Sequence, residues 1–234
     1  MLGILVQLAI SWLVVYFVEK KHLGVLGLRP TAGRLIDFFL FLLLAGVCCS
    51  LGFVLKIIFL DQHWQVNPEI TIKLIANGVW WNINSVLFEE LIFRGVLLYI
   101  AIQKLGERNG ILLSGITFGV YHWFSFNAFG NIPNMIFIFV YTGIMGLVFA
   151  YAYAKSGSMY IPVAIHLGWN VVQQVVFSNG PIGNQLLVQI SPDQGVDVSR
   201  VLFFSIQLFS IVFTPPFLFL ILKRMSNQQR WSHE

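Results

Sequence analysis

Continuous apolar runs of membrane-spanning length are the feature that most constrains this sequence. A helix needs about 20 apolar residues to cross the hydrocarbon core of a bilayer, and runs near that length recur throughout the chain. The runs are Met1 to Val18, Ile36 to Leu60, Ile70 to Ala101, Ile111 to Phe126, Asn134 to Ala154, Tyr160 to Phe177 and Val201 to Leu222. We therefore expect about seven spans, within a range of about six to eight. The third run is longer than a bilayer requires, and the fourth is short enough to be tilted or half-buried.

The same runs decide the fold class. A membrane barrel of strands needs alternating apolar and polar positions, whereas these runs are apolar without interruption. Only 10% of the residues are charged, against about a quarter in soluble domains, which excludes a soluble globular fold. The sequence predicts an all-α, polytopic transmembrane helix bundle that forms a single domain over residues 1–234.

Basic residues fall in alternate connections between the runs and predict the orientation. They are Lys20, Lys21, Arg29, Arg34, Lys104, Arg108, Lys155, Lys223, Arg224 and Arg230, while the opposite connections carry Asp61, Glu69, Asp193 and Asp197. Because basic loops stay in the cytoplasm, we expect the N-terminus outside and the C-terminus in the cytoplasm. The net charge of +4 is mostly of this kind, so it predicts no nucleic-acid partner. The short connections favour a bacterial plasma membrane as the location.

Three charged residues lie deep in the third run and need a physical explanation. A charge in the bilayer core is costly, so an ionisable residue there indicates either a function or a stabilising ion pair. Glu90 and Arg94 are four positions apart on one helix face, with the acid first, and this spacing predicts an ion pair. Glu89 points about 100° away from Glu90 and needs another partner.

Two histidines also lie within apolar runs. His122 is in the fourth run and His166 in the sixth, with Asn170 one helical turn after His166. Either histidine alone could be a hydrogen-bonded packing residue. A rise of about 1.5 Å per residue places both at depths compatible with Glu89, in a layer that faces the cytoplasm. Together these residues indicate a polar site inside the bundle.

The segments that carry these residues are FEELIFRG from Phe88, SGITFGVYH from Ser114 and IPVAIHLGWN from Ile161. They resemble the CAAX-protease and bacteriocin-processing (CPBP, also called Abi) family of intramembrane proteases. That family is marked by Glu-Glu-x-x-x-Arg, Phe-x-x-x-His and His-x-x-x-Asn motifs in this order. The resemblance covers a predicted catalytic core of about residues 80–174.

The resemblance implies a role for each motif residue. Glu89 would be the general base that activates a water with His122, while His166 and Asn170 would stabilise the oxyanion, and Glu90 and Arg94 would support the site. The family has also been described as metalloproteases, and a zinc ion would then be held by Glu89, His122 and His166. The chain has no His-Glu-x-x-His zinc helix, and we favour the metal-free mechanism, which requires no cofactor.

The predicted function is therefore an intramembrane endopeptidase that hydrolyses a peptide bond in a cytoplasm-facing cavity. Its partners would be the lipid bilayer and a peptide or membrane-protein substrate; no oligomeric state is predicted. The main alternative is a non-catalytic bacteriocin-immunity or membrane scaffold protein of the same family. A transporter could also use buried glutamates and histidines, but no inverted repeat supports one. A haem held by His122 and His166 would leave both glutamates unexplained.

Overall fold

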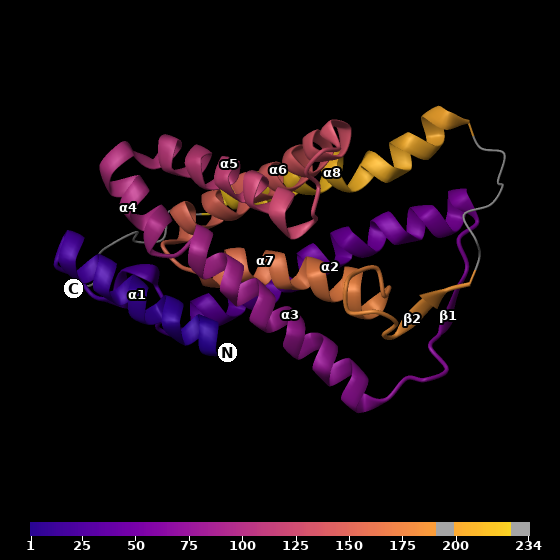
Figure 1. Cartoon of the computed structure of the whole chain (residues 1–234), viewed down its shortest axis with the longest axis horizontal. Helices are drawn as coiled ribbons and strands as arrows, with labels where there is room; N and C mark the ends of the chain where they lie inside the picture. The colour runs from indigo at the N-terminus through magenta and orange to yellow at the C-terminus, as the bar shows by residue number, and fades with distance from the viewer. Residues whose placement is uncertain (191–198, 226–234) are drawn as a thin grey trace.

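The computed structural model describes residues 1–190 and 199–225 as an α-helical bundle (Figure 1). Of the charged residues that predict the orientation, Asp193, Asp197 and Arg230 lie outside this part of the chain. The helices are α1 (Leu2–Glu19), α2 (Ala32–Leu60), α3 (Ile72–Phe93), α4 (Val96–Leu105), α5 (Glu107–Ser125), α6 (Ile132–Ser156), α7 (Tyr160–Asn170) and α8 (Arg200–Arg224). A short 3₁₀ helix, η1 (Leu23–Leu26), follows α1, and a π-helical turn, η2 (Val171–Val176), extends α7.

The predicted all-α membrane bundle is confirmed. Within the described residues, α1, α2, α6 and α8 are each long and apolar enough to cross a bilayer. The helices α3, α5 and α7 carry the polar motifs and fall outside this group. The chain is thus an integral membrane protein, while the number of spans stays a prediction.

The third apolar run is divided into α3 and α4 at Arg94 and Gly95. A Cβ atom at Gly95 would collide with the carbonyl oxygen of Leu91, so the backbone of this break requires glycine. The break leaves the Phe93 carbonyl without a helical partner, and the hydroxyl of Ser114 on α5 donates to it at 2.9 Å. As a result, Glu89 and Glu90 lie in the last turn of α3, directly beside α5.

Small residues bring the remaining site helices close together. Gly115 on α5 faces the side chain of Leu147 on α6, and Gly168 on α7 faces the backbone oxygen of Leu42 on α2. In each case a Cβ atom would be in steric conflict with the neighbouring helix. Close backbone approach at small residues is the usual way in which membrane helices pack. These contacts fix the helices that carry His122 and His166.

The two ends of the bundle differ in chemistry. At one end, the ends of α1 and α4 are joined by an ion pair between Glu19 and Lys104 at 2.9 Å, and the α6–α7 turn contacts η1 through a hydrogen bond from Ser158 to the Gly27 carbonyl. At the other end, strands β1 (Trp64–Val66) and β2 (Leu187–Gln189) pair in antiparallel register (Figure 1). Among the described residues, the basic side chains at the ends of α1, α4 and α6 lie at the first end.

Candidate active site

Glu90 is the fully buried centre of the polar cluster and binds two partners from different directions. Its Oε2 lies 3.3 Å from Nε of Arg94, and neither side chain has any solvent exposure. Its Oε1 accepts a hydrogen bond of 2.8 Å from Nδ1 of His166. The structure therefore places Glu90 and Arg94 at ion-pair distance, as their spacing predicts, and adds a link from α3 to α7 that the spacing could not predict.

The guanidinium of Arg94 is enclosed by aromatic rings. Its Cζ atom is 4.0 Å from the ring centroid of Phe118 and 4.8 Å from that of Phe149. Such cation–π contacts become stronger when water is excluded. Within the described residues its nitrogens make no hydrogen bond, so the ion pair with Glu90 and the two rings hold this charge.

Glu89 lies on the other face of α3, where both histidines converge on it. Its Oε2 is 3.9 Å from Nε2 of His122 and 3.9 Å from Nε2 of His166, and its side chain is 15% exposed. A distance of 3.9 Å is too long for a hydrogen bond, but it is the spacing at which a water molecule bridges polar groups. Glu89 Oε2 has no hydrogen-bond partner among the described residues.

The second ring nitrogen of each histidine fixes its tautomer. Nδ1 of His122 lies 2.8 Å from the carbonyl oxygen of Phe118, and Nδ1 of His166 contacts the Glu90 carboxylate. Because a carbonyl and a carboxylate only accept, each Nδ1 carries the proton. In the neutral rings, each Nε2 is then an acceptor. Each Nε2 acceptor thus lies 3.9 Å from Glu89 Oε2, which is itself an acceptor when ionised.

Aromatic rings hold both imidazoles in place. Phe149 stacks on His166 with ring centroids 5.0 Å apart and an angle of 18° between the planes. Phe118 meets His122 edge-on at 4.4 Å. Sequence reasoning gave Phe149 no role, because a chain with 22 phenylalanines offers no signal that separates one of them from the others.

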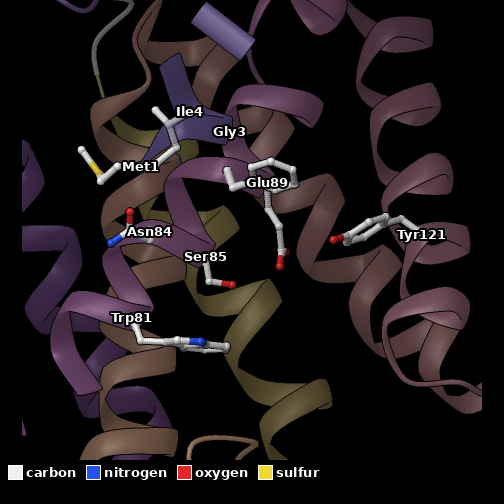
Figure 2. Close-up of a pocket in the computed structure, with 9 residues that line it drawn as sticks. Met1, Gly3, Ile4, Trp81, Asn84, Ser85, Glu89 and Tyr121 are labelled. Carbon is white, nitrogen blue, oxygen red and sulfur yellow. The ribbon is translucent and has the colours of Figure 1, made fainter. Parts of the chain in front are cut away.

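A cavity of about 310 Å³ opens beside Glu89 between α1, α3 and α5 (Figure 2). It is lined by Met1, Gly3, Ile4, Trp81, Asn84, Ser85, Phe88, Glu89 and Tyr121. Helix α1 therefore supplies part of the wall, although it lies outside the predicted core of residues 80–174. No sequence signal could have found this contribution, because the residues of α1 at the cavity carry no charge and no motif.

Among the described residues, Asn170 is the motif residue that makes no polar contact with the others. Its side chain is half-buried at the end of α7, and no hydrogen bond or ion pair joins it to Glu89, His122 or His166 in the described structure. The other six motif residues, Glu89, Glu90, Arg94, Phe118, His122 and His166, form one cluster.

The zinc ion that the resemblance implies would use the same side chains. Across residues 1–190 and 199–225, no three histidine, cysteine, aspartate or glutamate side chains are arranged so that they could hold a metal ion. The placement of Glu89, His122 and His166 thus does not support a zinc centre, and a metal-free site stays a prediction.

Comparison with known protein families bears on the same part of the chain. Residues 70–172 match the family described as type II CAAX prenyl endopeptidase Rce1-like. This segment is Rce1-like. It spans α3 to α7 and contains all seven motif residues, which confirms the resemblance drawn from the three motifs. No curated protein and no solved structure matches the chain. The Rce1-like segment supports a CAAX-protease type of enzyme; α1, α2 and α8 lie outside it.

Proposed function

We propose that this protein is an intramembrane endopeptidase in which Glu89 activates a water molecule for hydrolysis of a peptide bond. The observation that carries the proposal is the convergence of two imidazole Nε2 atoms on Glu89 Oε2, each at 3.9 Å, with both Nδ1 atoms already bound to protein. Because 3.9 Å is too long for a direct hydrogen bond, a water molecule can link these acceptors. The Rce1-like segment supports the same class of enzyme.

The buried charges explain how the site can move a proton. The two carboxylates of Glu89 and Glu90 face one guanidinium, that of Arg94, which leaves one negative charge in excess. An uncompensated charge in a buried site is costly, so the cluster favours one additional proton among Glu89, His122 and His166. A proton that three neighbouring groups can share suits a reaction that needs a base first and an acid afterwards.

In the proposed mechanism, Glu89 takes a proton from the bound water as the water oxygen attacks the carbonyl carbon of the substrate. The neutral His122 accepts the second hydrogen of the water at Nε2 and so orients it. When His166 is protonated, its Nε2–H can donate to the substrate oxygen, and Glu90 balances its charge. Protonated Glu89 then gives its proton to the leaving amine as the C–N bond breaks.

We also propose an orientation for the site in the membrane. The basic residues at the ends of α1, α4 and α6 favour the cytoplasmic side for that end of the bundle, with the N-terminus outside and the C-terminus inside. The substrate would be a peptide or a membrane protein that reaches the cavity beside Glu89. A bacterial plasma membrane is the proposed location.

Cleavage by the purified protein tests the proposal directly. Wild type, Glu89→Gln and His122→Ala would be compared on a peptide library in detergent, each with and without a zinc chelator. Glu89→Gln keeps the size of the side chain and removes the base, so we expect the rate to fall by about 10²–10⁴-fold. The fall should occur with and without chelator.

Three other results of the cleavage assay would contradict parts of this proposal. Wild-type cleavage that disappears on chelation and returns with added zinc would replace the metal-free mechanism with a zinc mechanism. Cleavage by Glu89→Gln at the wild-type rate would contradict the role of Glu89. Absence of cleavage by wild type on every peptide would favour the immunity or scaffold alternative.

A further inference from the structure

Tyr121 lines the cavity from the wall opposite Glu89. It precedes His122 on α5, and successive helical residues point about 100° apart, so its ring enters the cavity beside the catalytic cluster. Figure 2 shows its hydroxyl pointing from α5 toward the side of the cavity where the Glu89 carboxylate lies. The cavity therefore has a proposed base on one wall and a phenol on the other.

The Tyr121 ring is held firmly while its hydroxyl has no protein partner. Its centroid lies 5.2 Å from that of Phe93 and 5.3 Å from that of His122, and the latter pair meets edge-on at 89°. The side chain is half-buried. Among the described residues the hydroxyl makes no hydrogen bond, whereas a partly buried tyrosine usually finds a partner for this group. The hydroxyl is thus free to bind a molecule in the cavity.

The reaction needs more than one donor at the carbonyl oxygen, and protonated His166 supplies one of them. Hydrolysis of a peptide bond places negative charge on the carbonyl oxygen, and preorganised donors are required there. His122 in its neutral tautomer presents an acceptor at Nε2, and His166 donates there only when protonated. Asn170, which the resemblance assigns to the oxyanion, makes no polar contact with the cluster in the described structure.

Other polar groups of the cavity lie on the wrong wall. Trp81, Asn84 and Ser85 belong to α3, the helix that also carries Glu89. A donor to the carbonyl oxygen lies near the plane of the carbonyl group, by the oxygen lone pairs, while the water attacks the carbon from above or below that plane. Tyr121, on the facing helix, lies on another side of the cavity from Glu89 and can meet this requirement.

We propose that Tyr121 is a further catalytic residue, whose O–H donates a hydrogen bond to the oxygen of the scissile carbonyl as it becomes an oxyanion. The inference rests on the proposed peptidase function. As the water oxygen bonds to the carbonyl carbon, the C=O π electrons move to the oxygen and Glu89 holds the water's proton. The phenol keeps its own proton throughout. When the tetrahedral intermediate collapses, the C–N bond breaks and the amine leaves with the proton from Glu89.

The test uses Tyr121→Phe, which removes one oxygen and keeps the ring. Tyr151→Phe is the matched control, because Tyr151 is a half-buried tyrosine of α6 that packs on Phe219 of α8, away from the cavity. Loss of one oxyanion donor lowers kcat by about 10²–10³-fold in a well-studied protease. We expect a fall of about 10–10³-fold in kcat for Tyr121→Phe, little change in KM, and no change in either constant for Tyr151→Phe.

Binding of a transition-state mimic separates catalysis from folding. A phosphinic peptide places a charged oxygen where the oxyanion forms, whereas the intact peptide, bound to the Glu89→Gln background, does not. Tyr121→Phe should weaken the phosphinic peptide by at least tenfold and leave the intact peptide within about threefold, as expected when a transition-state interaction alone is lost. Equal weakening of both ligands would show a structural role and overturn the inference.

The kinetic measurements also test the role of Tyr121 separately from the proposed peptidase function. If wild type cleaves, Glu89→Gln does not, and Tyr121→Phe keeps the full kcat, the peptidase stands and the role of Tyr121 is wrong. If wild type cleaves none of the library, the peptidase function and the role of Tyr121 are overturned together.

Discussion

Glu90 has two partners in the structure, of which the sequence could predict only one. Its pairing with Arg94 could be predicted, because four positions along a helix always bring two side chains together. Its contact with His166 could not, because the two residues are 76 positions apart and meet only after α3 packs against α7. The same holds for the approach of both histidines to Glu89: the residue types indicate a polar site, but only packing determines which nitrogen faces which oxygen.

Removal of the Glu90 charge should lower the free energy of unfolding of the protein. Glu90→Gln keeps an oxygen that can accept from His166 but leaves the guanidinium of Arg94 buried without a counter-charge. Breaking a buried ion pair in this way costs about 3–5 kcal/mol. We expect a lower Tm for Glu90→Gln, measured by thermal unfolding in detergent.

The double variant Glu90→Gln with Arg94→Met provides the control. Because it removes both charges, it should regain most of the lost stability while peptide cleavage stays impaired. A Tm of Glu90→Gln equal to that of wild type would show that the ion pair does not stabilise the fold.

The break between α3 and α4 belongs to the scale of the helix. From the sequence, Ile70 to Ala101 is one apolar run that is too long for a single span, and nothing in its hydropathy marks the point at which it ends. The structure ends α3 at Phe93. The break brings the backbone of Gly95 so close to the carbonyl oxygen of Leu91 that no Cβ atom fits there. A depth counted at about 1.5 Å per residue along this run as one continuous helix therefore does not apply to Glu89, although the polar cluster forms.

An alanine at this break should be costly. Gly95→Ala places a Cβ against the Leu91 carbonyl oxygen, and residues forced into sparsely populated backbone conformations cost about 1–3 kcal/mol. We expect a lower Tm and weaker peptide cleavage, because α3 presents Glu89 and Glu90 in its last turn.

Gly33→Ala is a matched glycine variant. Gly33 lies in the first turn of α2 with open space around it, and alanine there should stabilise by up to about 1 kcal/mol. Equal Tm values for Gly95→Ala and Gly33→Ala would contradict a steric requirement at the break.

At the scale of the whole molecule, the described basic residues at the ends of α1, α4 and α6 lie at one end of the bundle, and Asp61, just before β1, lies at the other. The sequence shows the positions of these charges between apolar runs without tertiary information, and the orientation that they indicate stays a prediction. What it could not predict is the strand pair β1–β2, since two three-residue strands far apart in the chain have no periodicity of their own.

Thiol labelling of intact cells can test the orientation. The native Cys48 and Cys49 are both buried, so an introduced exposed cysteine should dominate the signal. With a membrane-impermeant maleimide, Gln65→Cys in β1 should react in intact cells, whereas Arg29→Cys, before α2, should react only after the cells are permeabilised. The reverse pattern would invert the proposed topology.

The wall that α1 adds to the cavity has a consequence for how such an enzyme could diversify. Met1, Gly3 and Ile4 touch the space beside Glu89 but belong to a helix outside the Rce1-like segment. Residue changes on this helix can alter the shape of the cavity without altering the acid, the histidines or their supports. Exchange of α1 for a helix with other side chains is therefore a modular route to new substrate preference, open both to evolution and to protein engineering.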